Sequence, residues 1–221
     1  MSESPTAQER PALQISAGLL GFAAELSSQE GTRYYLNGVY VEPCAEGGVT
    51  ATATDGHRLI SIRDPDGHID RPLILRAAKP FLAECRRYPT TPVIARELSV
   101  RFIAERIPQK RGQRAGYGIV ETIDGTFPNW RALVPQKMPD ESVVTPIRAR
   151  YLSAFAGLAG ADRHSGAIMV VSGTKDGPSF VFPASKGVFD WVGIVMPMRG
   201  DDIPSSLPAW LGLPSAEARA A

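Results

Sequence analysis

Apolar and polar positions recur along this chain in blocks, each with one helical pattern followed by three strand-like patterns. In the first block, residues 12–28 carry apolar side chains at helical spacing. Strands are expected over residues 33–42, 49–54 and 58–63, because β-branched and aromatic residues are frequent there and Gly-containing turns separate them. The strand expected before this helix is short, residues 12–15.

The same order of elements is expected twice more. The second block has a strand at 73–75, a helix at 79–87, and strands at 93–95, 98–105 and 118–123. The third has a strand at 142–147, a helix containing Tyr151, Leu152, Phe155 and Leu158, and strands at 167–172, 179–183 and 192–198. Such units must pack on one another to bury their apolar faces. The pattern therefore predicts an α+β fold of repeated β-α-β-β-β units.

Joints rich in Pro and Gly divide the chain further. They span residues 63–67 and 134–140, and the second is the better domain boundary. The expected organisation is a polar leader, two domains and a flexible tail rich in Pro and Ala, over residues 1–11, 12–135, 136–199 and 200–221.

The charge balance excludes a strong overall field. Over 221 residues, 24 Lys and Arg against 23 Asp and Glu give +1, so any affinity for nucleic acid must come from local clusters. No segment reaches the ~18 apolar residues of a membrane helix, and the N-terminus lacks the apolar core of a signal peptide. We expect a cytoplasmic protein with no membrane partner.

The two cysteines, Cys44 and Cys85, lack the spacing of metal ligands, so we expect no metal and no cofactor. Reduced thiols are typical of a cytosolic protein, although the sequence leaves a pairing between them open.

The stretch Val195-Met196-Pro197-Met198-Arg199 is chemically distinctive. Thioethers and a proline cannot transfer a proton or attack a carbonyl at neutral pH, but Met side chains adapt their packing to different partners. Two interpretations remain at this point: a buried terminal strand, or a groove that receives an apolar anchor from another protein.

Asp55 and His57 are the candidates for acid-base catalysis. They lie beside a Gly turn without a nucleophile, a second carboxylate or a metal-ligand set. No catalytic residue is assigned, and the protein is not expected to be an enzyme.

Four stretches occur in an order that points to a known family. They are Arg33-Tyr34-Tyr35-Leu36-Asn37-Gly38, Thr54-Asp55-Gly56-His57-Arg58-Leu59, Asp124-Gly125-Thr126-Phe127-Pro128-Asn129-Trp130-Arg131 and Val195-Met196-Pro197-Met198-Arg199. Together they closely resemble the DNA polymerase III beta subunit, the bacterial sliding clamp. The resemblance implies the DNA-clamp fold, with residues 12–135 matching that family's middle domain and 142–199 matching the second half of its last domain.

The chain is shorter than the family pattern. Clamps of this family have three domains of two units each, and two protomers close a ring around duplex DNA. With three units per chain, about four chains would supply the family's twelve units, so a working ring implies a homo-oligomer. The alternative is a protein that never encircles DNA.

The resemblance also implies a pocket that receives short hydrophobic peptides from DNA polymerases and other clamp-binding proteins. Its residues here would be Leu36, Thr54, Gly56, His57, Arg58, Leu59, Pro128, Leu133, Val195, Met196, Pro197, Met198 and Arg199. Apolar walls would hold the anchor residues, and cations at the rim would hold a peptide carbonyl or carboxylate.

Contact with double-stranded DNA in a clamp uses Lys and Arg against phosphates, without base reading. The candidates are Arg76, Lys79, Arg86, Arg87, Arg148 and Arg150 near the second and third helices, and Arg106, Lys110, Arg111 and Arg114 in a loop. The first helix offers no cation, which weakens this hypothesis. A clamp loader is a further candidate partner.

Two functions follow from the resemblance. The first is a clamp-like processivity factor of DNA replication or repair. The second is an adaptor or decoy that binds clamp-interacting peptides without forming a ring. A sequence near the C-terminus, Trp210-Leu211-Gly212-Leu213-Pro214, loosely resembles the Leu-x-Leu core of such peptides and could occupy the pocket itself, although an incidental apolar patch is the simpler interpretation.

Overall fold

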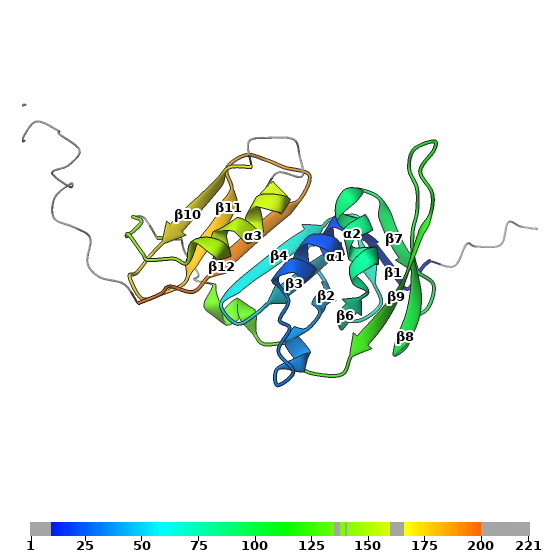
Figure 1. Cartoon of the computed structure of the whole chain (residues 1–221), viewed down its shortest axis with the longest axis horizontal. Helices are drawn as coiled ribbons and strands as arrows, with labels where there is room; N and C mark the ends of the chain where they lie inside the picture. Colours follow the sequence, from blue (N-terminus) through cyan, green and yellow to red (C-terminus); the bar gives the residue numbers. More distant parts are fainter. Residues whose placement is uncertain (1–9, 135–137, 140, 160–165, 200–221) are drawn as a thin grey trace, which may run out of the picture.

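The computed structural model describes residues 10–134, 138–139, 141–159 and 166–199. Within them the strands form one continuous 12-stranded sheet, with the order β10-β11-β12-β4-β3-β2-β6-β9-β8-β7-β1-β5. The helices α1, α2 and α3 lie along this sheet, and α3 lies beside β10–β12 (Figure 1). The expectation of an α+β fold built from repeated units is confirmed.

Three units follow one another along the chain. The first has β1 (Leu13–Ser16), α1 (Ala17–Ala23), β2 (Val39–Pro43), β3 (Val49–Thr54), β4 (Arg58–Asp64) and the short β5 (His68–Ile69). The second has β6 (Leu73–Ala77), α2 (Lys79–Arg87), β7 (Pro92–Ala95), β8 (Arg101–Arg106) and β9 (Gly116–Ile123). The third has α3 (Ala149–Ala159), β10 (Ile168–Ser172), β11 (Ser179–Pro183) and β12 (Asp190–Val195).

The third unit joins the first unit, although the second unit precedes it in the chain. β12 pairs antiparallel with β4 over six residue pairs, from Asp190↔Arg63 to Val195↔Arg58. Because of this ladder, the two domains expected from the sequence share one continuous sheet.

Helix α1 is buried on every side, including both of its glycines. It packs against α2, and the third unit covers it with Phe189, which lies against Phe22 and Gly18. A Cβ at Gly18 would lie only 2.5 Å from Cζ of Phe189, so this close approach needs glycine. The lack of cations on α1 therefore has a packing reason, because no charged side chain fits there.

The strands bury side chains on both faces of the sheet. Val39, Ile60 and Ile62 belong to the main core with the helices. On the opposite face, smaller clusters form around Leu36 and Leu59, and Trp130 packs against both of them. Trp130 lies in the 3-10 turn η3 (Trp130–Leu133), so the segment after β9 covers the second face.

Several sequence expectations were wrong in detail. Residues Tyr34–Leu36 form a 3-10 turn, η2, and the expected strand begins only at Val39. The last strand ends at Val195, so Met196–Met198 extend beyond it. Residues 142–147 form no strand, because no neighbouring strand among the described residues pairs with them. Residues 1–9 of the expected leader (1–11) and the expected tail at 200–221 lie outside the described residues.

None of the helices in the described part of the chain is long and apolar enough to span a bilayer.

Candidate partner-binding groove and helix-face cavity

The turn between β3 and β4 is organised by Asp55. One carboxylate oxygen accepts the backbone N–H groups of His57 and Arg58 at 3.0 Å, and the other accepts Nε of Arg58 at 3.0 Å. Gly56 adopts a φ of +88°, in the left-handed region that favours glycine. The residues Thr54-Asp55-Gly56-His57-Arg58 thus form a fixed turn that presents His57 to solvent.

The end of β12 lies directly beside this turn. Val195 is paired with Arg58 in the ladder, and the Met196 N–H donates to the carbonyl oxygen of His57 at 2.8 Å. The Met198 N–H donates to the carbonyl oxygen of Pro146 at 2.8 Å, which holds the stretch that follows β12. The structure therefore brings together two of the sequence stretches from which the pocket was predicted.

A cluster of cations and aromatic rings surrounds the same junction. His57 stacks on Tyr151 of α3, with ring centroids 5.8 Å apart and planes at 12°. The guanidinium groups of Arg58, Arg148 and Arg150 each lie within 5.7 Å of the centre of the Tyr151 ring. Such cation–π contacts orient the guanidinium groups and leave their N–H groups available to an anion or carbonyl.

The predicted pocket residues differ in how accessible they are. Val195, Leu36, Leu59 and Thr54 are buried, so they support the site from beneath. The accessible members include Gly56, His57, Pro128, Leu133, Met198 and Arg199, with Arg58, Met196 and Pro197 half-buried. We call this accessible set the groove residues, after the predicted groove. In the part of the chain that the structure describes, no hydrogen bond or ring contact links Pro128 or Leu133 to the junction of His57 with Met196. Leu133 is 42% exposed and Met198 37%, a high value for apolar side chains.

Sequence reasoning missed the supporting roles of three residues. Tyr151 is buried, as the helical stripe predicted, and it also lies against His57 and three arginines. Arg148, assigned to DNA contact, has its Nε 3.2 Å from Sδ of Met198 and so belongs to this junction. Trp130 was part of a quoted motif, and the structure gives it the role of joining the two clusters on the second face of the sheet.

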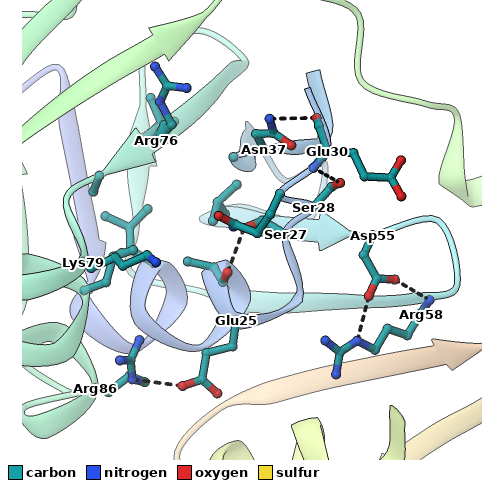
Figure 2. Close-up of a pocket in the computed structure, with 18 of the residues that line it drawn as sticks. Glu25, Ser27, Ser28, Glu30, Asn37, Asp55, Arg58, Arg76, Lys79 and Arg86 are labelled. Carbon is teal, nitrogen blue, oxygen red and sulfur yellow. Dashed lines mark hydrogen bonds and ion pairs between the residues drawn. The ribbon is translucent and has the colours of Figure 1, made fainter. Parts of the chain in front are cut away.

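A cavity of about 990 Å³ lies on the helix side, beneath the same turn. Figure 2 shows cations at its margins: Arg76, Lys79 and Arg86 come from the second unit, and Arg58 comes from the turn. Arg150 also lines it, so four of the ten residues predicted to contact DNA gather here.

Ion pairs compensate much of this positive charge. Arg86 lies 3.0 Å from Glu25, Arg58 lies 3.0 Å from Asp55, and Arg76 lies 2.7 Å from Glu121. Among the described residues, Lys79 and Arg150 have no acidic partner within ion-pair distance. These two are the best placed for a phosphate.

One predicted DNA contact is wrong. Arg106 is only 2% exposed: its guanidinium donates to the carbonyl oxygen of Arg114 at 2.9 Å and lies 4.6 Å from the centre of the Tyr88 ring. A buried guanidinium cannot reach a phosphate. Lys110, Arg111 and Arg114 are exposed on the β8–β9 loop, which extends beyond the sheet (Figure 1), and Arg87 is exposed at the end of α2.

The geometry around Asp55 does not support acid-base catalysis. Both of its carboxylate oxygens are occupied by the turn and by Arg58. No group of three or more His, Cys, Asp or Glu in the described ranges is arranged to hold a metal ion. Cys44 and Cys85 are both free thiols, so the open question of their pairing is answered.

Comparison with known proteins agrees with this architecture. No protein-family model matches the chain. A 116-residue stretch is 37% identical to the beta sliding clamp of Caulobacter vibrioides, which covers 49% of this chain and 29% of that protein. The solved sliding clamp of Bartonella birtlesii, bound to griselimycin, aligns with 90% of the chain at a TM-score of 0.60 and 15% identity. The chain has the sliding-clamp fold.

A second solved clamp, from Caulobacter crescentus, covers 90% of the chain at a TM-score of 0.58 and 20% identity. The chain accounts for 69% and 68% of the lengths of the two solved clamps, and the stretch matched in sequence is under one third of its curated relative. The chain thus resembles a shortened sliding clamp. Sliding clamps are non-catalytic processivity factors, which agrees with the expectation that this protein is not an enzyme.

Proposed function

We propose that this chain is a clamp-like factor of DNA replication or repair that acts in the cytoplasm and binds DNA polymerases and other proteins through the groove residues. In this proposal, residues 12–135 correspond to the middle domain of a clamp and 136–199 to the second half of its last domain. The observation that carries the proposal is the junction between Met196 and His57, because it places the Met-Pro-Met stretch against the turn Thr54–Arg58.

The groove has the chemistry that a short hydrophobic peptide requires. Met198 and Leu133 offer exposed apolar surface, and Met side chains adapt to different anchors. His57 and Arg58 stand at the rim, where they can bind a carbonyl or carboxylate. Burying one or two large apolar side chains contributes about 2–6 kcal/mol, a large part of the ~8 kcal/mol that micromolar binding represents.

Peptide binding can be measured by fluorescence anisotropy with a fluorescein-labelled peptide that has a Leu-x-Leu core. Met198→Glu should weaken binding at least tenfold, because it places a charge in the apolar groove. Ile103→Glu is the matched control, since Ile103 is 67% exposed on β8, in the second unit. Equal affinities for the wild type and Met198→Glu would overturn the groove assignment.

Griselimycin is a second probe, because the solved Bartonella clamp binds it. Competition between griselimycin and the labelled peptide is expected if both occupy the groove. Simultaneous binding of the two would place the peptide elsewhere on the chain.

The helix side is the proposed surface for duplex DNA. Lys79 and Arg150 begin α2 and α3, line the cavity and lack acidic partners in the described ranges. Contacts to phosphates release counterions, so binding should weaken steeply with salt. Lys79→Glu combined with Arg150→Glu should abolish retention on closed circular DNA, whereas Lys186→Glu, in the loop between β11 and β12, should leave it unchanged.

The same DNA assay separates the ring from the adaptor. Retention on closed circles, alone or after addition of a clamp loader, supports encirclement. Peptide binding without retention under either condition would replace the ring with the adaptor that binds clamp-interacting peptides.

A further inference from the structure

The first two units complete each other's sheets. β1, the first strand of the first unit, pairs with β7 of the second unit, and β6, the first strand of the second unit, pairs with β2 of the first. Each three-stranded meander therefore receives its fourth strand from the other unit. This reciprocal exchange relates the two units by an approximate two-fold axis, with α1 packed against α2.

The third unit has both halves of this arrangement but no partner within the described residues. β10 is the first strand of the meander in its unit, as β2 and β7 are in theirs. It forms one edge of the 12-stranded sheet. Residues 142–147, the equivalent of β1 and β6, precede α3 but belong to no strand. The Pro146 carbonyl oxygen accepts one hydrogen bond from Met198, just after β12, on the side where β6 pairs with β9, the last strand of the second unit, over four residue pairs.

The 143–145 segment and the edge strand β10 also expose apolar side chains. Val144 is 69% exposed, Met169 50% and Val143 40%. The stretch Val143-Val144-Thr145 is uncharged and β-branched, a composition typical of a paired strand. An uncharged sheet edge of this kind is a template for another strand.

Among the described residues, only the Ser172 end of the β10 edge is occupied, by residues 142 and 143 of the same chain. The N–H of Ser172 donates to Ser142 Oγ at 3.1 Å, and its carbonyl oxygen accepts the N–H of Val143 at 2.8 Å. Backbone groups alternate along a strand, so Ile168 and Val170 direct theirs toward the same side as Ser172. Residues 168–170 therefore remain for pairing, and β2 likewise uses its first three residues, Val39–Val41, to pair with β6.

We propose that two copies of this chain associate through their third units. Each copy would release its 143–145 segment from its own Ser172 and Thr174 and place it beside β10 of the other. The pair repeats between chains the exchange that the first two units make within one chain. Ile74 lies five residues before the start of α2 and pairs with Tyr40, the second residue of β2. Counting in the same way from α3 and β10 gives the register Val144↔Met169 across the two chains.

A second copy is the occupant because the two missing parts are complementary and belong to the same unit. The interface is thus isologous: one chain's edge receives a strand, and its own strand fills the edge of the partner. Pro146 is compatible with the pairing because its carbonyl oxygen already faces the chain's own Met198, and the proposed cross-chain ladder ends before it.

The mass of the full chain by light scattering and sedimentation velocity at micromolar concentration tests the proposal. We expect the wild type to associate in even numbers, and Val144→Lys with Met169→Lys to halve its mass. Both side chains are exposed, so the variant should fold, which circular dichroism can verify. Ile103→Lys on β8 is the control and should keep the wild-type mass. A monomeric wild type, or a lysine variant of unchanged mass, would overturn the proposal.

The register can be tested by mixing single-cysteine variants in a Cys44→Ser background. Directly opposed residues of a non-hydrogen-bonded antiparallel pair have Cα atoms about 4.5 Å apart, within the range of about 4.4–6.8 Å that a disulfide spans. Val144→Cys mixed with Met169→Cys should form a disulfide-linked dimer under mild oxidation, and neither variant alone should do so. Cross-linking of each variant alone, or none in the mixture, would refute this register.

The interface proposal goes beyond the proposed function and fails separately from it. The lysine variant should still bind the labelled peptide, because the groove lies in one chain. Met198→Glu should lose the peptide but keep the wild-type mass. A lysine variant of unchanged mass would show that the interface proposal alone is wrong, and a Met198→Glu variant of unchanged peptide affinity would show that the groove assignment alone is wrong.

Discussion

The ring of Phe189 meets the ring of Phe22 edge to face, with centroids 6.4 Å apart and planes at 65°. Phe189 directly precedes β12 and is buried against Gly18 of α1, so it fixes the third unit on the first. Phe189→Ala should lower the free energy of unfolding by about 3–5 kcal/mol, as for other large buried aromatic residues. Chemical denaturation measures this effect.

The same variant should also weaken peptide binding, because the turn and the end of β12 would be held less firmly. Tyr117→Ala is the matched control, since the Tyr117 side chain is 65% exposed on β9. Wild-type stability in Phe189→Ala would show that the third unit is held by the β4–β12 ladder alone.

Arg106 should affect stability and leave DNA affinity unchanged. Its guanidinium packs on Tyr88 and donates to the Arg114 carbonyl. Arg106→Ala should cost about 1–3 kcal/mol, because it leaves a cavity and an unpaired carbonyl. Thermal unfolding together with DNA binding at several salt concentrations checks both parts. A lower salt dependence in a fully stable variant would return Arg106 to the DNA surface.

The two thiols should differ in reactivity. Burial raises the pKa of Cys85 to about 12, and the thiolate is the reactive form, so Cys85 should resist alkylation in the native protein. Cys44 is only half-buried and should be labelled first. Peptide mass mapping after iodoacetamide treatment at about pH 8 distinguishes the two sites. Equal labelling of both in the folded state would contradict the burial of Cys85, and unfolding in urea should remove the difference.

The stability of the fold should depend on pH through Glu121 of β9. The hydrogen bond and charge of Arg76 hold the pKa of Glu121 below 4.5, its ordinary value. A lowered native pKa means that the interaction stabilises the fold above the unfolded pKa and is lost as the pH falls through the native pKa. Arg76→Ala should raise the Glu121 pKa in an NMR titration, and an unchanged titration would show that the ion pair is not formed in solution.

The elements predicted best are those whose bounds follow from the local pattern of apolar and polar residues. The bounds of α2, β3 and β11 agree with the structure, because helical spacing or short apolar alternation specified each of them. Tyr34–Leu36 were expected in a strand on account of their aromatic content. They form a turn instead, because Leu36 is buried with Ile74 and Phe127 on the second face of the sheet, a tertiary contact that propensity does not report.

Two further differences between the predictions and the structure have separate causes. Arg106 falls on the buried face shared with Phe102 and Ala104, and strict alternation along β8 could have identified it. Residues 142–147 have the composition of a strand, but strand formation depends on a neighbour. The groove was predicted only through family resemblance, because His57 and Met196 are far apart in the chain and meet only through the β4–β12 ladder.

The reciprocal strand exchange determines which way the two grooves of a paired assembly would face. A two-fold axis that exchanges the units while keeping their helices on one side of the sheet reverses the direction of every strand. The turn Thr54–Arg58 lies at one end of its strands, so in the proposed pair the two grooves would open toward opposite rims. The two sides of such an assembly would be equivalent, so a partner protein could bind to it from either direction along the DNA.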